Sequence, residues 1–114
     1  MRKLSEVALA SRDRTAVEAA VGLLRDLFPV ERVILFGSKA KGTDDAESDI
    51  DLLVLTGRLL SWQERDAITD ALFDVELAHD VVISTLVLPC EEWDRGPYVV
   101  LPIHQEVQEH GAVA

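Results

Sequence analysis

Two apolar segments restrict the possible folds of this chain more than any other feature. Val33–Phe36 is an unbroken apolar run that ends at Gly37, and a second run, Leu52–Leu55, follows directly after Asp49, Ile50 and Asp51. Unbroken apolar runs of this length are typical of strands that are buried on both faces of a sheet. We therefore expect an α/β chain with helices packed on a small sheet.

The two aspartates before the second run indicate a cation site. Side chains two residues apart in a strand point to the same face, so Asp49 and Asp51 should face one site. Two carboxylates ~4 Å apart repel by about 4 kcal/mol at an effective dielectric constant near 20. Mg²⁺ relieves this repulsion, and it commonly combines one or two carboxylates with waters and substrate phosphates. This pattern favours a nucleotide site.

The turn after the first run has the composition of a phosphate-binding segment. Gly37 allows a close approach of the backbone to a ligand, Ser38 adds a hydroxyl, and Lys39 and Lys41 add positive charge. The alternative is an ordinary turn followed by an edge strand with solvated acids. Asp is depleted in strands, so two aspartates at alternate positions of one strand favour the functional interpretation.

Gly37-Ser38, ten intervening residues and Asp49-Ile50-Asp51 resemble the signature of the DNA polymerase beta-like nucleotidyltransferase superfamily. More narrowly, the short chain resembles the minimal nucleotidyltransferases (MNT) of the MntA type, which act as antitoxins in HEPN/MNT toxin–antitoxin pairs. The resemblance implies a mixed sheet of about three to four strands packed with helices. It also implies that residues 1–114 form a single nucleotidyltransferase domain.

The resemblance implies two groups of site residues. The catalytic and metal-binding residues are Asp49, Asp51 and Asp80. The nucleotide-binding residues are Gly37, Ser38 and Lys41. In this scheme the first two aspartates bind two Mg²⁺ ions, and the third binds the ion that activates the attacking hydroxyl. Lys41 stands where many relatives carry arginine, and lysine lacks the planar fork that grips phosphate.

Asp80 is the member of the first group that lies farthest along the chain from the motif. It opens the segment Asp80–Leu88, which is rich in Val and Ile and reads as a third strand. A carboxylate at the start of that strand could reach the metal site. The alternative is a simple turn residue between a helix and a strand, because Asp is common in turns.

Periodicity and capping signals predict the remaining elements. The expected helices are Arg14–Phe28, a helix that begins at a capping box of Ser61 and Glu64 and continues to Ala78, and a last helix through Ile103, Val107 and His110. The expected strands are Arg32–Phe36, Asp49–Leu55 and Asp80–Leu88. A polar and mobile loop is expected at Thr43–Glu47.

Composition narrows the class of protein. The chain has 11 Lys and Arg against 21 Asp and Glu, a net charge of −10, which opposes binding to long DNA or RNA. Cys90 is the only cysteine, so an internal disulfide is excluded. No apolar stretch reaches the roughly 18 residues of a membrane helix. We expect a cytoplasmic protein without membrane or long nucleic acid partners.

The resemblance and the short length lead to one principal hypothesis. The chain is expected to be a Mg²⁺-dependent protein adenylyltransferase that transfers AMP from ATP to a hydroxyl of another protein, a tyrosine of its HEPN toxin, and so acts as an antitoxin. The chain leaves little room for an acceptor site, which favours a complex with a partner or an oligomer. The alternatives are an antitoxin that acts by binding alone and a nucleotidyltransferase for small molecules of the aminoglycoside type.

Overall fold

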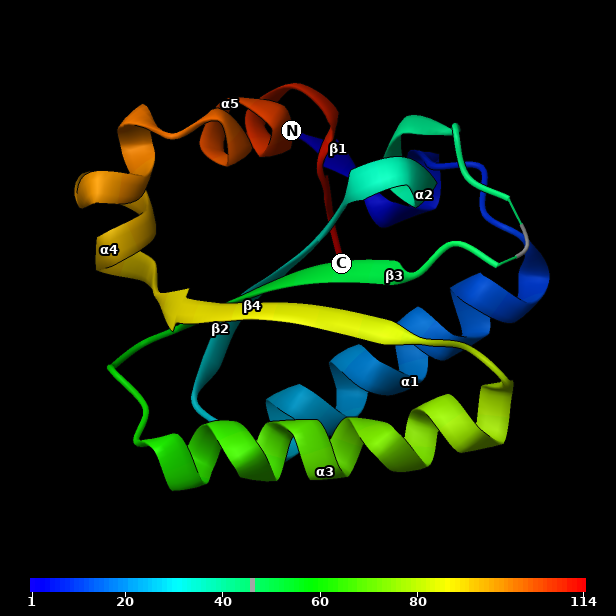
Figure 1. Cartoon of the computed structure of the whole chain (residues 1–114), viewed down its shortest axis with the longest axis horizontal. Coiled ribbons are helices and arrows are strands. Elements are labelled where there is room, and N and C mark those ends of the chain that lie inside the picture. The colour runs from blue at the N-terminus through cyan, green and yellow to red at the C-terminus, as the bar shows by residue number, and fades with distance from the viewer. Residues whose placement is uncertain (46) are drawn as a thin grey trace.

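The computed structural model, which describes residues 1–45 and 47–114, contains a mixed sheet with helices on both faces (Figure 1). The strand order is β1-β5-β2-β3-β4. The strands are β1 (Arg2–Lys3), β2 (Val30–Phe36), β3 (Ile50–Thr56), β4 (Ile83–Pro89) and β5 (Ala112–Val113). The α-helices are α1 (Ser11–Leu27), α2 (Gly37–Lys41), α3 (Trp62–His79), α4 (Cys90–Arg95) and α5 (Pro102–His110). Two 3₁₀ helices, Leu4–Glu6 and Pro97–Val100, complete the list.

The pairing of the three long strands brings the sequence motifs to one end of the sheet. Strands β2 and β3 are antiparallel, with Phe36 opposite Asp51, whereas β3 and β4 are parallel, with Asp51 opposite Ser84. The end of β2, where Gly37 begins α2, therefore lies beside the starts of β3 and β4.

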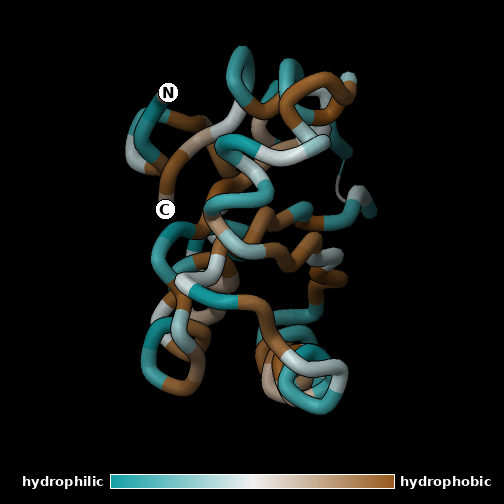
Figure 2. The backbone as a smooth tube through the Cα atoms, turned by 90° about the vertical axis from the view of Figure 1, so that its left-hand side faces the viewer, coloured by the Kyte–Doolittle hydropathy of each residue, from teal (hydrophilic) through white to brown (hydrophobic). Residues whose placement is uncertain are grey.

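The residues of β3 alternate between two hydrophobic cores. Ile50 and Leu52 belong to the core beneath α1 and α3, while Leu53 and Leu55 belong to the core with Trp93 of α4 and Val107 of α5. Figure 1 shows α1 and α3 on one side of the sheet and α4 and α5 on the other, and Figure 2 shows hydrophobic segments gathered in the strands between these layers. By alternation, Asp49 and Asp51 lie on the α4–α5 face of the sheet.

Most long elements agree with the sequence-based expectations, and the mixed α/β class is confirmed. The capping box starts α3 as predicted: Ser61 Oγ accepts a hydrogen bond from the Glu64 backbone N–H at 3.1 Å, and Glu64 Oε1 accepts one from the Ser61 N–H at 3.0 Å. The sheet has two further strands, β1 and β5, which are too short to leave a periodic pattern. The segment after Pro89, for which the sequence pattern predicts no helix, forms α4.

The predicted strand start at Asp80 was wrong. Asp80 is the residue that ends α3, in the left-handed conformation with φ 54°, and its backbone N–H still bonds to the carbonyl of Glu76. Asp is one of the few residues other than Gly that adopts this conformation readily. Strand β4 begins only at Ile83.

The expected loop at Thr43–Glu47 follows α2, and its described residues belong to no helix or strand. The expectation of a mobile segment includes Ala46, which lies outside the described residues. Across the two described ranges, none of the helices combines the length and apolar character needed to cross a lipid bilayer.

Candidate active site

Asp51 is the second residue of β3 and Asp49 immediately precedes the strand, and both lie on the face where α5 packs. Asp49 is exposed and Asp51 is half-buried. Ser84, on the neighbouring strand β4, is opposite Asp51 in the register and donates a hydrogen bond from Oγ to Asp49 Oδ2 at 3.3 Å. We name Asp49 and Asp51 the acid pair. Its oxygens remain accessible to a ligand.

The acid pair is electrostatically strained. Burial raises the pKa of Asp51 above its usual value, and the negative charges of Asp49 and then Glu106 raise it further. All three causes disfavour the ionised carboxylate. A cation between the carboxylates would remove the repulsion and stabilise the charged form, so the pair is suited to a divalent ion.

Gly37 is in close contact with the acid pair. A Cβ atom at this position would lie 2.2 Å from Asp51 Oδ2, well inside van der Waals contact, and the residue has φ +75°. Only glycine satisfies both conditions without strain. Gly37 therefore lets the first residue of α2 pack against the Asp51 carboxylate.

We expect the substitution Gly37→Ala to displace the Asp51 carboxylate and to lower catalytic activity at least tenfold. Gly42→Ala is the matched control, because Gly42 has nearly the same backbone angle, φ +76°, but no atom within 4 Å of its would-be Cβ. Both variants carry the left-handed strain, roughly 1–2 kcal/mol, and only the first has the clash. Comparison of thermal unfolding and of catalytic rates separates the two effects. Equal rates for the two variants would contradict the role of the Gly37 contact.

The two lysines of α2 differ in their surroundings. Lys41 is partly exposed, and its ammonium group lies 2.5 Å from Glu106 Oε1 on α5. Since the charge of Glu106 also raises the pKa of Asp51, Lys41 and Glu106 border the acid pair on its α5 side. Ser38 is half-buried in the first turn of α2.

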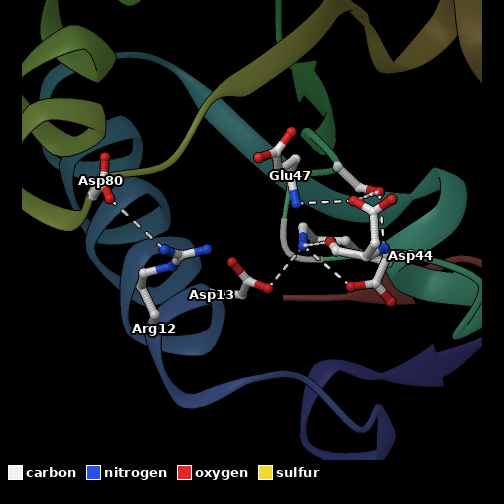
Figure 3. A network of polar contacts seen from close by, with 8 residues as sticks. Arg12, Asp13, Asp44, Glu47 and Asp80 are labelled. Atoms are coloured by element: carbon white, nitrogen blue, oxygen red, sulfur yellow. Dashed lines mark hydrogen bonds and ion pairs between the residues drawn. The ribbon is translucent and has the colours of Figure 1, made fainter.

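Lys39, in contrast, is directed into the protein. Its side chain is 1 % exposed and its ammonium group lies 2.8 Å from Asp13 Oδ2 of α1, 3.2 Å from Asp44 Oδ2 and 3.4 Å from the Asp45 carbonyl. Figure 3 shows Asp13 and Asp44 within this polar network. The positive charge of Lys39 therefore links α2 and the following loop to α1, and only Lys41 remains near the acid pair.

The structure does not bring Asp80 to the acid pair. The Asp80 side chain is 98 % exposed and lies 3.8 Å from Arg12 of α1, on the α1 side shown in Figure 3. Within residues 1–45 and 47–114, no three His, Cys, Asp or Glu side chains form a group that could hold a metal ion. The predicted three-carboxylate cluster is therefore not formed by the described residues.

Asp80 instead lines a cleft of about 430 Å³ at the same end of the sheet. Its walls include Arg12 and Asp13 from α1, Ser48 from the loop before β3, and Val82. Ser48 directly precedes Asp49, so the cleft adjoins the acid pair.

Sequence reasoning did not identify two residues beside the acid pair, Ser84 and Glu106. A serine four residues after Asp80 has no distinguishing signal until the pairing of β3 with β4 is known. Glu106 lies on α5, whose apolar spacing indicates which side is buried but not where the helix packs. Both residues reach the site through tertiary contacts.

Comparison with known proteins identifies a family and a relative whose sequences resemble this chain. Residues 18–88 match the family described as polymerase beta, nucleotidyltransferase. MJ0141 of Methanocaldococcus jannaschii, provisionally named a protein adenylyltransferase, is 38 % identical over 58 residues, which cover 51 % of this chain and 59 % of that protein. The chain thus spans less than two thirds of the length of this relative.

Solved structures show the same fold. A mutant of the MntA–HepT toxin–antitoxin pair superposes with a TM-score of 0.60 at 27 % identity, covering 86 % of this chain and 70 % of the other. The complex of a tri-AMPylated Shewanella oneidensis HEPN toxin with its MNT antitoxin has a TM-score of 0.56 at 23 % identity, covering 88 % and 69 %. With the acid pair packed on Gly37 and more than half of its length matched, the chain belongs to the polymerase beta nucleotidyltransferase family.

Proposed function

We propose that this protein transfers AMP from ATP to a hydroxyl of a partner protein, a tyrosine of a HEPN-type toxin, and thereby acts as its antitoxin. The observation that carries the proposal is the acid pair packed on Gly37 at an accessible end of the sheet, in a chain of the nucleotidyltransferase family. The reaction uses ATP, and we assign it to the cytoplasm.

The residues present fit a magnesium ion. Asp49 and Asp51 supply hard carboxylate oxygens on one face, and burial, followed by the charges of Asp49 and Glu106, raises the pKa of Asp51. Magnesium accepts such a pair together with phosphate oxygens and water. Bound Mg²⁺ would supply positive charge to the phosphate oxygens of ATP during transfer.

The other residues near the pair would bind and orient the nucleotide. Gly37 and Ser38 lie where the triphosphate would approach Asp51, and Lys41 would exchange its ion pair with Glu106 for a contact to phosphate. In the transfer, the acceptor oxygen forms a bond to the α-phosphorus while the bond from that phosphorus to the β-phosphate oxygen breaks. Pyrophosphate leaves, and the proton of the acceptor hydroxyl passes to solvent.

The proposed partner is supported by the similar proteins. The relative from Methanocaldococcus jannaschii is named for protein adenylylation, and several of the structural neighbours are toxin–antitoxin complexes. The net charge of −10 is compatible with a protein partner and unfavourable for long nucleic acids.

The test is the intact mass of the HEPN-domain protein from the same genome after incubation with this chain, Mg²⁺ and each of the four nucleoside triphosphates. We expect a gain of one or more AMP units with ATP, and no gain with the Asp49→Ala/Asp51→Ala variant. The same preparation is assayed for toxin activity, which should fall as AMP is added.

Two outcomes would favour the alternatives. Neutralisation of the toxin by the wild-type chain and the double variant alike, without a mass change, would indicate an antitoxin that acts by binding. Modification of an aminoglycoside, with no modification of protein, would indicate a small-molecule nucleotidyltransferase.

A further inference from the structure

Strand β4 brings no carboxylate to the acid pair. Asp51 lies opposite Ser84 in the parallel pairing, and Ser84 Oγ bonds to Asp49 Oδ2. Val82 precedes β4, which begins at Ile83, and lines the cleft together with Arg12 and Asp13. Val82 is 55 % exposed. The residue of β4 that faces the acid pair is thus a serine, and the residue just before the strand is a valine.

The nearest acid of this segment cannot replace them. Asp80 lies in the left-handed residue that ends α3, before β4 begins, and its carboxylate pairs with Arg12. Moving it to the acid pair would require a shift of the β4 register. Such a shift by an odd number of residues would expose the buried Ile83, and a shift by two would break the pairing that runs from Ile50 to Thr56.

Glu106 does not complete the group either. Its carboxylate comes from α5 rather than from the sheet, and it is paired with Lys41 at 2.5 Å in this structure. It acts on Asp51 through charge, but the described residues hold no group of three potential metal ligands that includes it.

We propose that this protein binds one divalent metal ion with its nucleotide. Ser84 occupies the position at which a third carboxylate would be needed for a second ion, and it is a positioning residue that orients Asp49. This inference rests on the proposed function. A neutral hydroxyl neither offsets the charge of a second cation nor competes well with water for it, because Mg²⁺ gives up its waters reluctantly. The acceptor hydroxyl is therefore deprotonated without a second ion held by this chain.

The experiment counts metal ions per bound nucleotide. Mn²⁺ serves as the probe, and the nucleotide is an ATP analogue with a methylene group between the α- and β-phosphates, which cannot be cleaved there. Equilibrium dialysis gives the Mn²⁺ and the nucleotide retained by the protein. We expect a ratio of one for the wild type and for Asp80→Ala. For Ser84→Asp we expect a ratio of two, with a second Mn²⁺ bound at least tenfold more tightly than in the wild type.

Thr85→Asp is the matched control, because Thr85 is the next residue of the same strand, is also exposed, and faces the opposite side of the sheet. It should leave the ratio at one. A ratio of two in the wild type would overturn the inference while leaving the proposed function intact, and a fall from two to one in Asp80→Ala would assign the second ion to Asp80. If Ser84→Asp fails to fold, the ratios of Mn²⁺ to nucleotide in the wild type and in Asp80→Ala still test whether the protein binds one metal ion. Absence of both Mn²⁺ and nucleotide binding by the wild type would overturn the proposed function itself.

Discussion

Replacement of the acid pair, Asp49→Ala/Asp51→Ala, is expected to reduce AMP transfer by about 10³-fold or more. Metal-assisted stabilisation of charge in the transition state contributes several kcal/mol, and each 1.36 kcal/mol changes the rate tenfold. Without the two carboxylates, the described part of the chain would lose the acids that lie against Gly37 and would hold a metal ion beside the triphosphate. The measurement is the single-turnover rate of label transfer from α-³²P-ATP to the partner protein at saturating Mg²⁺.

The stability of this variant distinguishes loss of chemistry from loss of structure. Burial and the charges of Asp49 and Glu106 all raise the pKa of Asp51, so its ionised form is disfavoured in the folded protein. Its removal should leave the free energy of unfolding at neutral pH unchanged or increase it. Asp70→Ala removes an exposed acid on α3, in the opposite layer, and should leave the transfer rate unchanged. A double variant that retained more than a tenth of the wild-type rate would refute a catalytic role for the acid pair.

The second large effect concerns stability. Lys39→Ala should lower the free energy of unfolding by about 3–5 kcal/mol, because it leaves the buried carboxylate of Asp13 without its cation. Asp13 Oδ1 already lacks a hydrogen-bond partner among the described residues, so the loss of Lys39 would leave both oxygens of this carboxylate unsatisfied within them. Denaturant unfolding followed by circular dichroism measures the change.

Lys41→Ala is the matched control for Lys39→Ala. It removes a lysine from the same helix whose ion pair with Glu106 is partly exposed, and exposed pairs contribute about 0–1 kcal/mol. The double substitution Asp13→Leu/Lys39→Met should recover much of the stability, because it removes the uncompensated charge. If Lys39→Ala and Lys41→Ala lowered the free energy of unfolding equally, the buried Lys39–Asp13 pair would stabilise the fold no more than the partly exposed Lys41–Glu106 pair.

The buried pair also predicts a response to alkaline pH. Burial alone would lower the pKa of Lys39, but the hydrogen bonds that Lys39 donates to Asp13 and Asp44 outweigh this effect, and the pKa lies above its ordinary value. A raised pKa means that the stabilisation is fully present below the pKa of the unfolded chain, about 10.4, and is lost as the pH rises through the pKa of the folded protein. The free energy of unfolding of the wild type should therefore fall above this pH more steeply than that of Asp13→Leu/Lys39→Met.

Sequence reasoning succeeded where the signal is local. The capping box of Ser61 and Glu64 starts α3 where predicted, because both partners lie within one helical turn. The apolar runs became β2 and β3, since a strand buried on both faces requires apolar residues throughout. The shared face of Asp49 and Asp51 likewise follows from the period of a strand, without knowledge of its neighbours.

Sequence reasoning failed where contacts with a distant segment of the chain decide what a side chain does. Both Lys39 and Lys41 were expected beside the phosphate site, but helix geometry places them on different sides of α2. One meets the buried Asp13 of α1 and the other meets Glu106 of α5. Their partners lie 26 and 65 residues away in the chain, so no local pattern distinguishes a structural lysine from a functional one.

The sequence by itself determined the family, the two central strands, and the position of Gly37 and the acid pair, because each depends on spacings within one short segment. Only the tertiary structure decided what lies across from the acid pair. The αL residue that ends α3 sets where β4 begins, and the β3–β4 register then brings Ser84 rather than Asp80 to Asp51. That register depends on packing α3 against the sheet, a cooperative property of the whole fold that local residue patterns do not encode.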